Sequence, residues 1–370
     1  MEESSFFGAV LTSDILGEFL LSGVRDCVLV APARNPSQAA AHPSKIFTMV
    51  DRTDKRNSLF WALAADYEKH GAKSETTVAC PLCLAEYNLA NLAELIREHI
   101  VPSKLGGRSV TLTCRKCNNA QGSFLDSHII NFMKSLDAIE GAGPIRTSVV
   151  SDKERITAEL HLGTGTPDNP IAIQIVGQAS NLGAVQGLRE SLRDDSTLEL
   201  KMSFPFVPER YIRAAFRAAF LSVFRVEGYG YALSHGGDQV RTMLGNNTPV
   251  LKNVVMEAFP EPDPATDLLV MPASFSDFGE YYAVLLKLQT KRTRYISVFL
   301  PGRHGQDWTA LEALYDHAPR LRLETTPDGW DSKLYIRFGC NPMARFEKGL
   351  QDRLLPPSRL NLDAEEYPKT

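Results

Sequence analysis

Four of the six cysteines form two Cys-x-x-Cys pairs, and these are the residues whose spacing most directly indicates chemistry. The pairs are Cys80 with Cys83 and Cys114 with Cys117, and residues 84–113 lie between them. Each knuckle turns tightly enough for both sulfurs to face one ion, and four thiolates complete a tetrahedral shell with no open position. We therefore expect a structural Zn²⁺ that binds no substrate. The alternative is two unrelated cysteine pairs.

Glu98 and His99 are adjacent in the strand-like run LIREHIVP. Neighbouring strand residues point to opposite faces, so a metal-binding carboxylate beside a histidine base requires a bent or bulged strand end. Pro102 and the glycine-containing loop 103–107 are consistent with such an end. A lone histidine is more often an ordinary core or surface residue, but the neighbouring motifs favour a functional interpretation of His99.

Asn118 follows the second cysteine pair directly and begins a predicted helix. The apolar stripe of this helix consists of Leu125, Ile129, Phe132 and Leu136. Asn118 offers an oxygen ligand at the helix N-terminus, in a position that the zinc shell just before it would fix. Gly122 lies one turn later on the same face and leaves room for a phosphate.

In this order and spacing, residues 80–126 resemble the zinc-bearing branch of the HNH endonucleases, which has the form C-x-x-C, E-H-I-x-P, L-G-G and C-x-x-C-N followed by a glycine. The resemblance implies a ββα-metal fold, in which a two-stranded ribbon and one helix surround a divalent ion. It also implies that His99 is the general base, that Glu98 is a carboxylate ligand, and that Asn118 is the last ligand of a catalytic Mg²⁺ or Mn²⁺.

This chain departs from the family at the middle asparagine, which orients the base. The corresponding sequence here is SVTLTC, so Ser109 or Thr111 stands near the position of that asparagine. Which residue would orient His99 therefore stays undecided. The remaining residues are consistent with hydrolysis of a phosphodiester. A hard divalent ion stabilises the negative charge on the phosphodiester, and a neutral imidazole takes a proton from water near neutral pH. We expect metal-dependent cleavage of DNA, in defence or mobile-element biology. The alternative is a zinc-stapled module that binds nucleic acid or protein without catalysis.

Basic residues lie around these motifs, and their charge could hold a nucleic-acid backbone. The candidate DNA-binding residues are Lys104, Arg108, Arg115 and Lys116, with Arg97 nearby. An ordinary solvated surface is the alternative for each of them.

Other polar residues near the motifs receive a structural interpretation. Asp126 lies roughly 12 Å along the helix from Asn118 at 1.5 Å per residue, too far to share its ion, and His128 lies farther. The arginines of a later helix recur every three or four residues and so share one face. They are Arg210, Arg213 and Arg217, and we interpret them as a solvated helix face rather than as a DNA contact.

The length, composition and charge of the chain limit the kinds of protein that it can be. The chain has 370 residues, of which 44% are hydrophobic and 23% charged, which suits two or three globular domains. The net charge of -4 argues mildly against nucleic acid as a partner, although a small basic site can lie in an acidic protein. The sequence shows no signal peptide and no transmembrane run, so we expect a cytoplasmic protein without a membrane partner. In a reducing compartment, sparse cysteines indicate metal rather than disulfides, and we expect Cys27 and Cys340 in the core.

Hydrophobic patterning predicts an α+β fold in three regions. Residues 1–76 form an α/β region with helices at 13–24 and 58–71 and strands at 26–32 and 46–51. Residues 77–136 form the HNH module. Residues 148–356 form an α+β domain with several strands, a helix near 182–192 and a long helix that begins at Pro208.

The first region also resembles the first domain of thiamine-diphosphate enzymes, in particular the menaquinone-pathway synthases. The matching text is GVRDCVLVAPARNPSQAAAH followed by DKRNSLFWALA. In that family a glutamate that activates the cofactor stands where this chain has Lys55. A lysine cannot supply the acidic group, so we interpret the resemblance as one of fold and expect no thiamine diphosphate.

Overall fold

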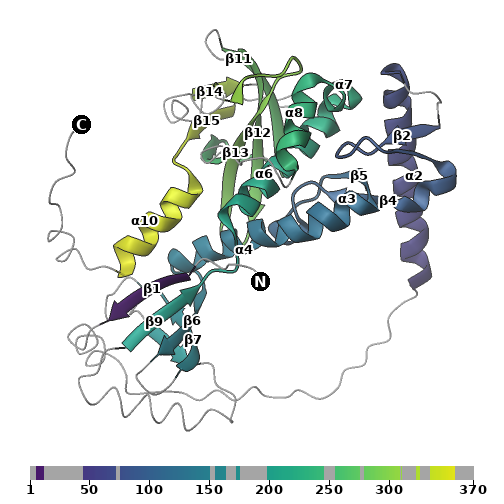
Figure 1. The fold of residues 1–370 in the computed structure, drawn as a ribbon. Helices are drawn as coiled ribbons and strands as arrows, with labels where there is room; N and C mark the ends of the chain where they lie inside the picture. The colour runs from purple at the N-terminus through teal and green to yellow at the C-terminus, as the bar shows by residue number, and fades with distance from the viewer. Residues whose placement is uncertain are drawn as a thin grey trace. The chain divides into compact units, whose positions relative to one another are not determined.

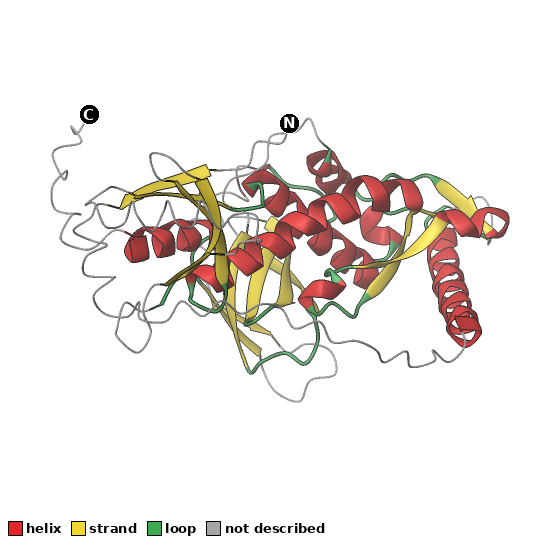
Figure 2. Ribbon diagram, turned by 90° about the horizontal axis from the view of Figure 1, so that it is seen from below, coloured by secondary structure: helices red, strands yellow, loops and turns green. Residues whose placement is uncertain are grey.

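The computed structural model describes residues 6–11, 45–71, 76–150, 155–163, 172–175, 198–245, 255–275, 279–308, 310, 322–325 and 334–354. Within these residues helices and antiparallel sheets occur together, which confirms a mixed α+β fold (Figures 1 and 2). No helix in this part of the chain combines the length and apolarity that a membrane span requires.

The chain divides into two compact units. Unit 1 comprises Met1–Gln38, Asn131–Phe206 and Met343–Thr370, and unit 2 comprises Ala39–Ile130 and Val207–Pro342. Each of the three regions expected from the sequence contributes residues to both units, and the three-region division stays a prediction.

Unit 1 contains a five-stranded antiparallel sheet with the order β1-β9-β6-β7-β8. The strands are β1 (Phe6–Leu11), β6 (Pro144–Val150), β7 (Arg155–His161), β8 (Ala172–Ile175) and β9 (Leu198–Ser203). Buried and more exposed residues alternate along β6 and β7, as expected for a sheet with one face on a core. Helix α10 (Pro342–Leu354) adds Phe346 to that core, where its ring centroid lies 4.8 Å from that of Phe204.

Unit 2 is built on a six-stranded antiparallel sheet with the order β11-β12-β13-β10-β15-β14. The strands are β10 (Val255–Glu261), β11 (Leu268–Phe275), β12 (Gly279–Gln289), β13 (Thr293–Pro301), β14 (Arg322–Thr325) and β15 (Leu334–Phe338). Helix α6 (Pro208–Glu227) packs against β11, β12 and β13, and the short α7 (Tyr229–Ala232) and α8 (His235–Leu244) follow it (Figure 1). Every residue from Tyr211 to Phe224 is buried, so α6 is a core helix of this unit.

The motif-bearing segment of unit 2 is made of short elements that follow the long helix α2 (Lys45–Lys69). Strands β2 (Thr77–Ala79) and β3 (Glu86–Asn88) form one hairpin, and β4 (Leu95–His99) and β5 (Val110–Cys114) form a second ribbon. The 3₁₀ turns η1 (Leu89–Glu94) and η2 (Ser103–Leu105) connect them. After β5 the chain continues through α3 (Arg115–Cys117) and the π-helical turn η3 (Asn118–Gly122) into α4 (Ser123–Ile139).

The structure contradicts the sequence analysis at an expected strand and at an expected core cysteine. The expected strand at 46–51 lies inside α2, because no glycine or proline separates it from the helical residues that follow. Cys340 is exposed rather than packed in the core. The expected helices at 13–24 and 182–192, the expected strand at 26–32, and Cys27 lie outside the described residues.

Candidate functional site

The first cysteine pair lies in a tight turn after β2. Cys80 accepts a hydrogen bond through its carbonyl from the backbone N–H of Leu84 at 2.8 Å, and its own N–H donates to the carbonyl of Ala85 at 2.9 Å. Leu84 has a φ of 58°, in the left-handed region that a leucine seldom adopts. The turn therefore keeps Cys80 and Cys83 on one side of the loop.

The second pair joins the end of β5 to α3. The backbone N–H of Cys117 donates to the Sγ of Cys114 at 3.3 Å, and the backbone N–H of Cys114 donates to the Sγ of Cys80 at 3.3 Å. These N–H groups point at the sulfurs and favour their thiolate forms. The two knuckles are thus held together by backbone donors as well as by their sulfur atoms.

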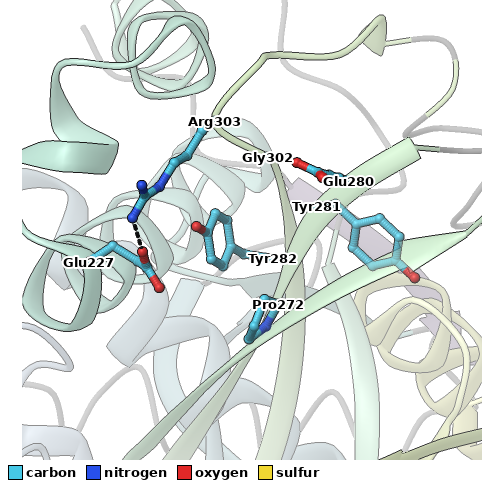
Figure 3. Close-up of a pocket in the computed structure, with 7 residues that line it drawn as sticks. All are labelled: Glu227, Pro272, Glu280, Tyr281, Tyr282, Gly302 and Arg303. Carbon is cyan, nitrogen blue, oxygen red and sulfur yellow. Dashed lines mark hydrogen bonds and ion pairs between the residues drawn. The ribbon is translucent and has the colours of Figure 1, made fainter.

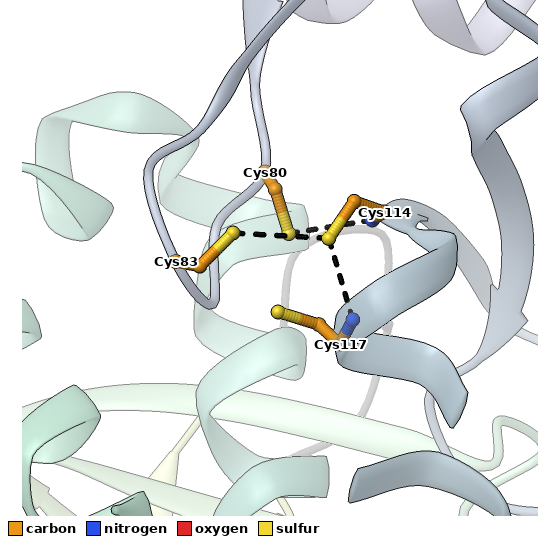
Figure 4. Close-up of side chains that lie close together, drawn as sticks. All are labelled: Cys80, Cys83, Cys114 and Cys117. Carbon is orange, nitrogen blue, oxygen red and sulfur yellow. Dashed lines mark hydrogen bonds between the residues drawn. The ribbon is translucent and has the colours of Figure 1, made fainter. Parts of the chain in front are cut away.

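The four sulfurs converge on one point, as Figure 4 shows, and all lie within 4.8 Å of one another. A zinc tetrahedron with Zn–S bonds of about 2.3 Å has edges of about 3.8 Å, and Cys83 Sγ lies 3.7 Å from Cys114 Sγ. Hydrogen bonding to Cys80 lowers the pKa of Cys83 to about 6 and that of Cys114 to about 4, while the pKa of Cys80 is raised. The predicted cluster is confirmed, and it could bind a metal such as zinc.

Glu98 and His99 end strand β4 and point in opposite directions. In the β4–β5 ribbon Glu98 is opposite Thr111 and His99 is opposite Val110. Glu98 is only 6% exposed, whereas His99 is exposed. The strand alternation thus directs the carboxylate into unit 2 and the imidazole toward solvent.

Asn118 meets Glu98 beneath the ribbon. With its amide nitrogen toward Glu98, Asn118 donates to Glu98 Oε1 at 3.2 Å. With its amide oxygen there, Asn118 and Glu98 would oppose oxygen to oxygen, an arrangement that a cation between them would stabilise. A Cβ on Gly122 would lie 2.8 Å from Asn118 Oδ1 and 3.2 Å from both Glu98 Oε1 and Arg217 Nη2, so only a glycine lets these side chains pack against the turn at this site. The π-helical turn from Asn118 to Gly122 brings both residues to it.

Arg217 of α6 enters the same site, which sequence reasoning missed. Its side chain is 1% exposed, and its Nη2 lies 2.9 Å from Glu98 Oε1. Its Nη1 lies 3.6 Å from Asp126 Oδ1. The interpretation of the α6 arginines as a solvated face is therefore wrong: Arg213 is also buried, and its guanidinium donates to backbone carbonyls of Met243 and Gly245.

Asp126 and His128, interpreted from the sequence as structural residues, contact other groups of unit 2, and Asp126 lies beside the Arg217 that faces Glu98. Burial raises the pKa of Asp126 to about 7, although the nearby Arg217 guanidinium acts in the opposite direction. The Nδ1 atom of His128 accepts a hydrogen bond from the backbone N–H of Val207 at 3.0 Å. Arg210 lies over the ring of Phe124, with its guanidinium carbon 4.2 Å from the ring centroid.

The donor set at Glu98 and Asn118 fits a hard divalent ion. Such ions prefer carboxylate and amide oxygens, and both kinds of group meet beside Gly122. Arg217 is a cation that already faces the same carboxylate. The residues thus provide oxygen ligands, and a bound ion would take the place that the Arg217 guanidinium holds beside Glu98.

Asp267, the residue just before β11, anchors the loop between β4 and β5. Its Oδ2 accepts from the backbone N–H of Arg108 at 2.7 Å and of Ser109 at 2.8 Å, and its Oδ1 accepts from Ser109 Oγ at 2.7 Å. Ser109 is therefore bound to Asp267 and is not the residue that orients His99. Gly106 has a φ of 84°, and a Cβ on Gly107 would collide with the carbonyl of Val101, so the loop requires both glycines.

The four candidate DNA-binding residues are exposed. Lys104 and Arg108 lie on the β4–β5 loop, and Arg115 and Lys116 lie on α3. Arg115 Nε lies 3.8 Å from Glu94 Oε2, so its charge is shared with a neighbour. The positive charge near the site therefore comes from two short elements on either side of β5.

Tyr229 links the first knuckle to the helices after α6. The backbone N–H of Ala79 donates to Tyr229 Oη at 3.0 Å, and this hydroxyl donates in turn to the carbonyl of Ala79. Asp66 of α2 accepts from the backbone N–H of Tyr229 at 2.7 Å. Nearby, Arg225 donates to the carbonyl of Val110 at 2.9 Å. The cysteine-bearing segment is thus held in place by residues that precede it in the chain and by residues that follow it.

A cavity of about 350 Å³ lies elsewhere in unit 2, and Figure 3 shows the side chains around it. Arg303 and Glu227 form an ion pair there, and Tyr282 points toward this pair whereas Tyr281 points away. The lining includes none of the site residues predicted from the sequence. This cavity therefore plays no part in the site at Glu98.

Comparison with known proteins finds no match: no family model, no curated protein and no solved structure is similar to this chain. The functional assignment therefore depends on the chemistry of the site itself.

Proposed function

We propose that unit 2 carries a metal-dependent endonuclease site of the HNH type, which hydrolyses phosphodiester bonds of DNA. The proposal rests on one observation above all. Glu98 and Asn118, from the ribbon and from the turn before α4, meet beside Gly122, and His99, the next residue after Glu98, is exposed on the opposite face of the strand. These are the residue types that bind a hard cation and accept a proton.

His99 acts as the general base in this proposal. Its exposed imidazole is accessible to water and to a nucleic-acid backbone. A neutral imidazole has a natural pKa close to neutrality and can take a proton from an attacking water. A divalent ion at Glu98 and Asn118 would supply the positive charge that stabilises the phosphodiester and its leaving oxygen.

The exposed basic residues on either side of β5 would hold the DNA backbone. Lys104 and Arg108 are presented by the loop that Asp267 anchors, and Arg115 and Lys116 by the turn that carries two of the cysteines. Such contacts to phosphates set affinity and orientation rather than sequence choice. The zinc cluster supports one set of these residues and Asp267 supports the other.

A binding module without catalysis is the second candidate. It is favoured by the ion pair between Arg217 and Glu98, which supplies the carboxylate with a cation from the protein. The absence of the family's orienting asparagine also favours it, since Ser109 is bound to Asp267. This candidate predicts DNA binding by the zinc-replete protein with no cleavage at any concentration of Mg²⁺ or Mn²⁺.

The test is single-turnover cleavage of a plasmid by the zinc-replete full chain, with Mg²⁺, with Mn²⁺ and without either. His99→Ala should retain zinc and fold, and its cleavage rate should fall by about 10²–10⁴-fold, the usual contribution of a general base. His304→Ala, which changes an exposed histidine on the loop after β13, is the matched control and should cut like wild type. A His99→Ala protein that cuts as fast as wild type would exclude this mechanism.

A further inference from the structure

Arg217 is an unusual residue for the interior of α6. It is the bulkiest of the fully buried side chains, in a helix whose other buried residues are mainly apolar. Burying a charge is costly unless it is paired and hydrogen-bonded. Its Nε has no hydrogen-bond partner within the described residues, and its Nη2 approaches Glu98 without hydrogen-bond geometry. The guanidinium is thus held by charge more than by directional bonds.

Two carboxylates compete for this guanidinium. Nη2 lies 2.9 Å from Glu98 and Nη1 lies 3.6 Å from Asp126. The first carboxylate also faces Asn118 beside Gly122, and the second does not. Arg217 can therefore release Glu98 and still keep an opposite charge within reach.

We propose that Arg217 and a divalent ion are alternative counter-charges for Glu98, and that Asp126 retains the guanidinium when the ion binds. This inference rests on the proposed function, because it assigns Arg217 and Asp126 as positioning residues for that site. In the metal-free protein Arg217 neutralises the buried Glu98 carboxylate. When the ion binds, the ion takes over this role from Arg217.

A count of formal charges supports a role for Arg217 after metal binding as well. With both carboxylates ionised, Glu98, Asp126 and Arg217 sum to one negative charge. A divalent cation brings the sum to one positive charge, and one phosphodiester brings it to zero. Without Arg217 the same site would be neutral with the ion bound and negative with the phosphodiester. Arg217 thus makes the net charge of the metal-bound site positive, which favours an anionic ligand.

The inference predicts opposite effects of two substitutions on Mn²⁺ binding. Arg217→Met removes the competitor, so Mn²⁺ should bind about tenfold more tightly, or by about 1.4 kcal/mol. Asp126→Asn removes the second partner and leaves Arg217 on Glu98, so Mn²⁺ should bind about tenfold more weakly. Arg213→Met is the matched control, because Arg213 is a buried arginine of the same helix that binds backbone carbonyls, and it should leave Mn²⁺ affinity unchanged.

A double substitution separates this relay from general electrostatics. If Asp126 acts through Arg217, then Asp126→Asn should have no effect on Mn²⁺ affinity in the Arg217→Met protein. If the two residues only change the local potential, their effects should add. Additive effects would overturn the inference.

The experiment is calorimetric titration of the zinc-replete full chain with MnCl₂, with thermal denaturation as a second readout and Glu98→Gln as the reference that lacks the ligand. Arg217→Met leaves Glu98 buried without its cation, so it should be stabilised by Mn²⁺ more than wild type is. If that protein does not fold, Asp126→Asn carries the test, because Asp126 is partly exposed; unchanged Mn²⁺ affinity in it would overturn the inference.

The same titrations distinguish the inference from the proposed function. Mn²⁺ binding that Glu98→Gln abolishes, with the predicted changes in the variants but no plasmid cleavage, would support the inference and refute the nuclease. Cleavage with Mn²⁺ affinities that do not respond to Arg217 or Asp126 would do the reverse. If neither wild type nor Arg217→Met binds Mn²⁺ in a manner that depends on Glu98, both fail.

Discussion

Replacing Asp267 with alanine should release the β4–β5 loop without unfolding unit 2. The carboxylate accepts three hydrogen bonds from Arg108 and Ser109, which lie 159 and 158 residues earlier in the chain. The loop has its own 3₁₀ turn at Ser103–Leu105, and Leu105 is buried, so other contacts remain after the substitution. The expected defect is therefore local opening of the loop.

The size of the effect follows from the number and kind of these bonds. Hydrogen bonds to a charged group contribute about 1.5–3 kcal/mol each, and water that reaches the released N–H groups compensates in part once the loop opens. We therefore expect the free energy of opening the loop to fall by about 2–3 kcal/mol. This corresponds to a population of the open loop about 30- to 150-fold larger.

Burial opposes ionisation of Asp267, yet the hydrogen bonds from Ser109 and Arg108 prevail and lower its pKa. Its stabilising contribution is consequently present above the unfolded pKa near 3.9 and is lost as the pH falls through the folded pKa.

Limited trypsin digestion measures this opening directly, because Lys104 and Arg108 are exposed cleavage sites in the anchored loop. At pH 8 the Asp267 carboxylate is ionised, and cleavage of native wild type at these two residues should be slow. Asp267→Ala should raise the initial rate by about 30- to 150-fold, in proportion to the open population. The control is Asp263→Asn, which removes an exposed carboxylate from Lys287 and should change the rate less than twofold. Equal rates for Asp267→Ala and wild type would refute the anchoring role.

Three further predictions concern the cysteine cluster and the first region. Cys117→Ser should lower bound zinc below one per chain and loosen the cysteine-bearing segment, and elemental analysis that finds no zinc in fresh wild type would contradict this. Tyr229→Phe should leave the backbone of Ala79 without its buried hydroxyl partner, at a cost of about 1–3 kcal/mol. Zinc should therefore pass to a chelator faster than it does from wild type. Tyr335→Phe, which changes an exposed tyrosine, is the control and should not change the rate of zinc transfer. Calorimetry should detect no Mg²⁺-dependent binding of thiamine diphosphate, since Lys55 stands where the resembling family has an acid.

The sequence predicted the cysteine cluster because the pattern is local. A Cys-x-x-Cys turn depends on four residues, and the second pair begins as β5 ends, so the chain has little freedom in how Cys114 and Cys117 are presented. The strand at Glu98 and the helical start at Asn118 were predictable for the same reason. The helix that begins at Pro208 was predicted as well, since its spacing is strongly helical.

Arg217 could not be found from its spacing alone. Arginines three and four residues apart on a helix are usually a solvated face, and only tertiary packing places this one beside Glu98. A signal was nevertheless present, because α6 carries alanine and phenylalanine on every side, and a helix that is apolar all round is buried. A charge in such a helix needs a partner, although the sequence does not say that the partner is a glutamate more than a hundred residues earlier.

The pairing of β1 with β9 bears on how the chain acquires its structure during synthesis. β1 is translated well before its antiparallel partner, Leu198–Ser203, and α10 of the same unit is translated later still. Unit 2 is likewise divided, with Ala39–Ile130 made long before Val207–Pro342. Nascent proteins generally fold one domain at a time from the N-terminus. Here unit 1 cannot be completed before α10 is translated, and unit 2 cannot be completed before Val207–Pro342 is translated. The segments made first therefore lack their later partners during synthesis, and chaperones would matter most in that period.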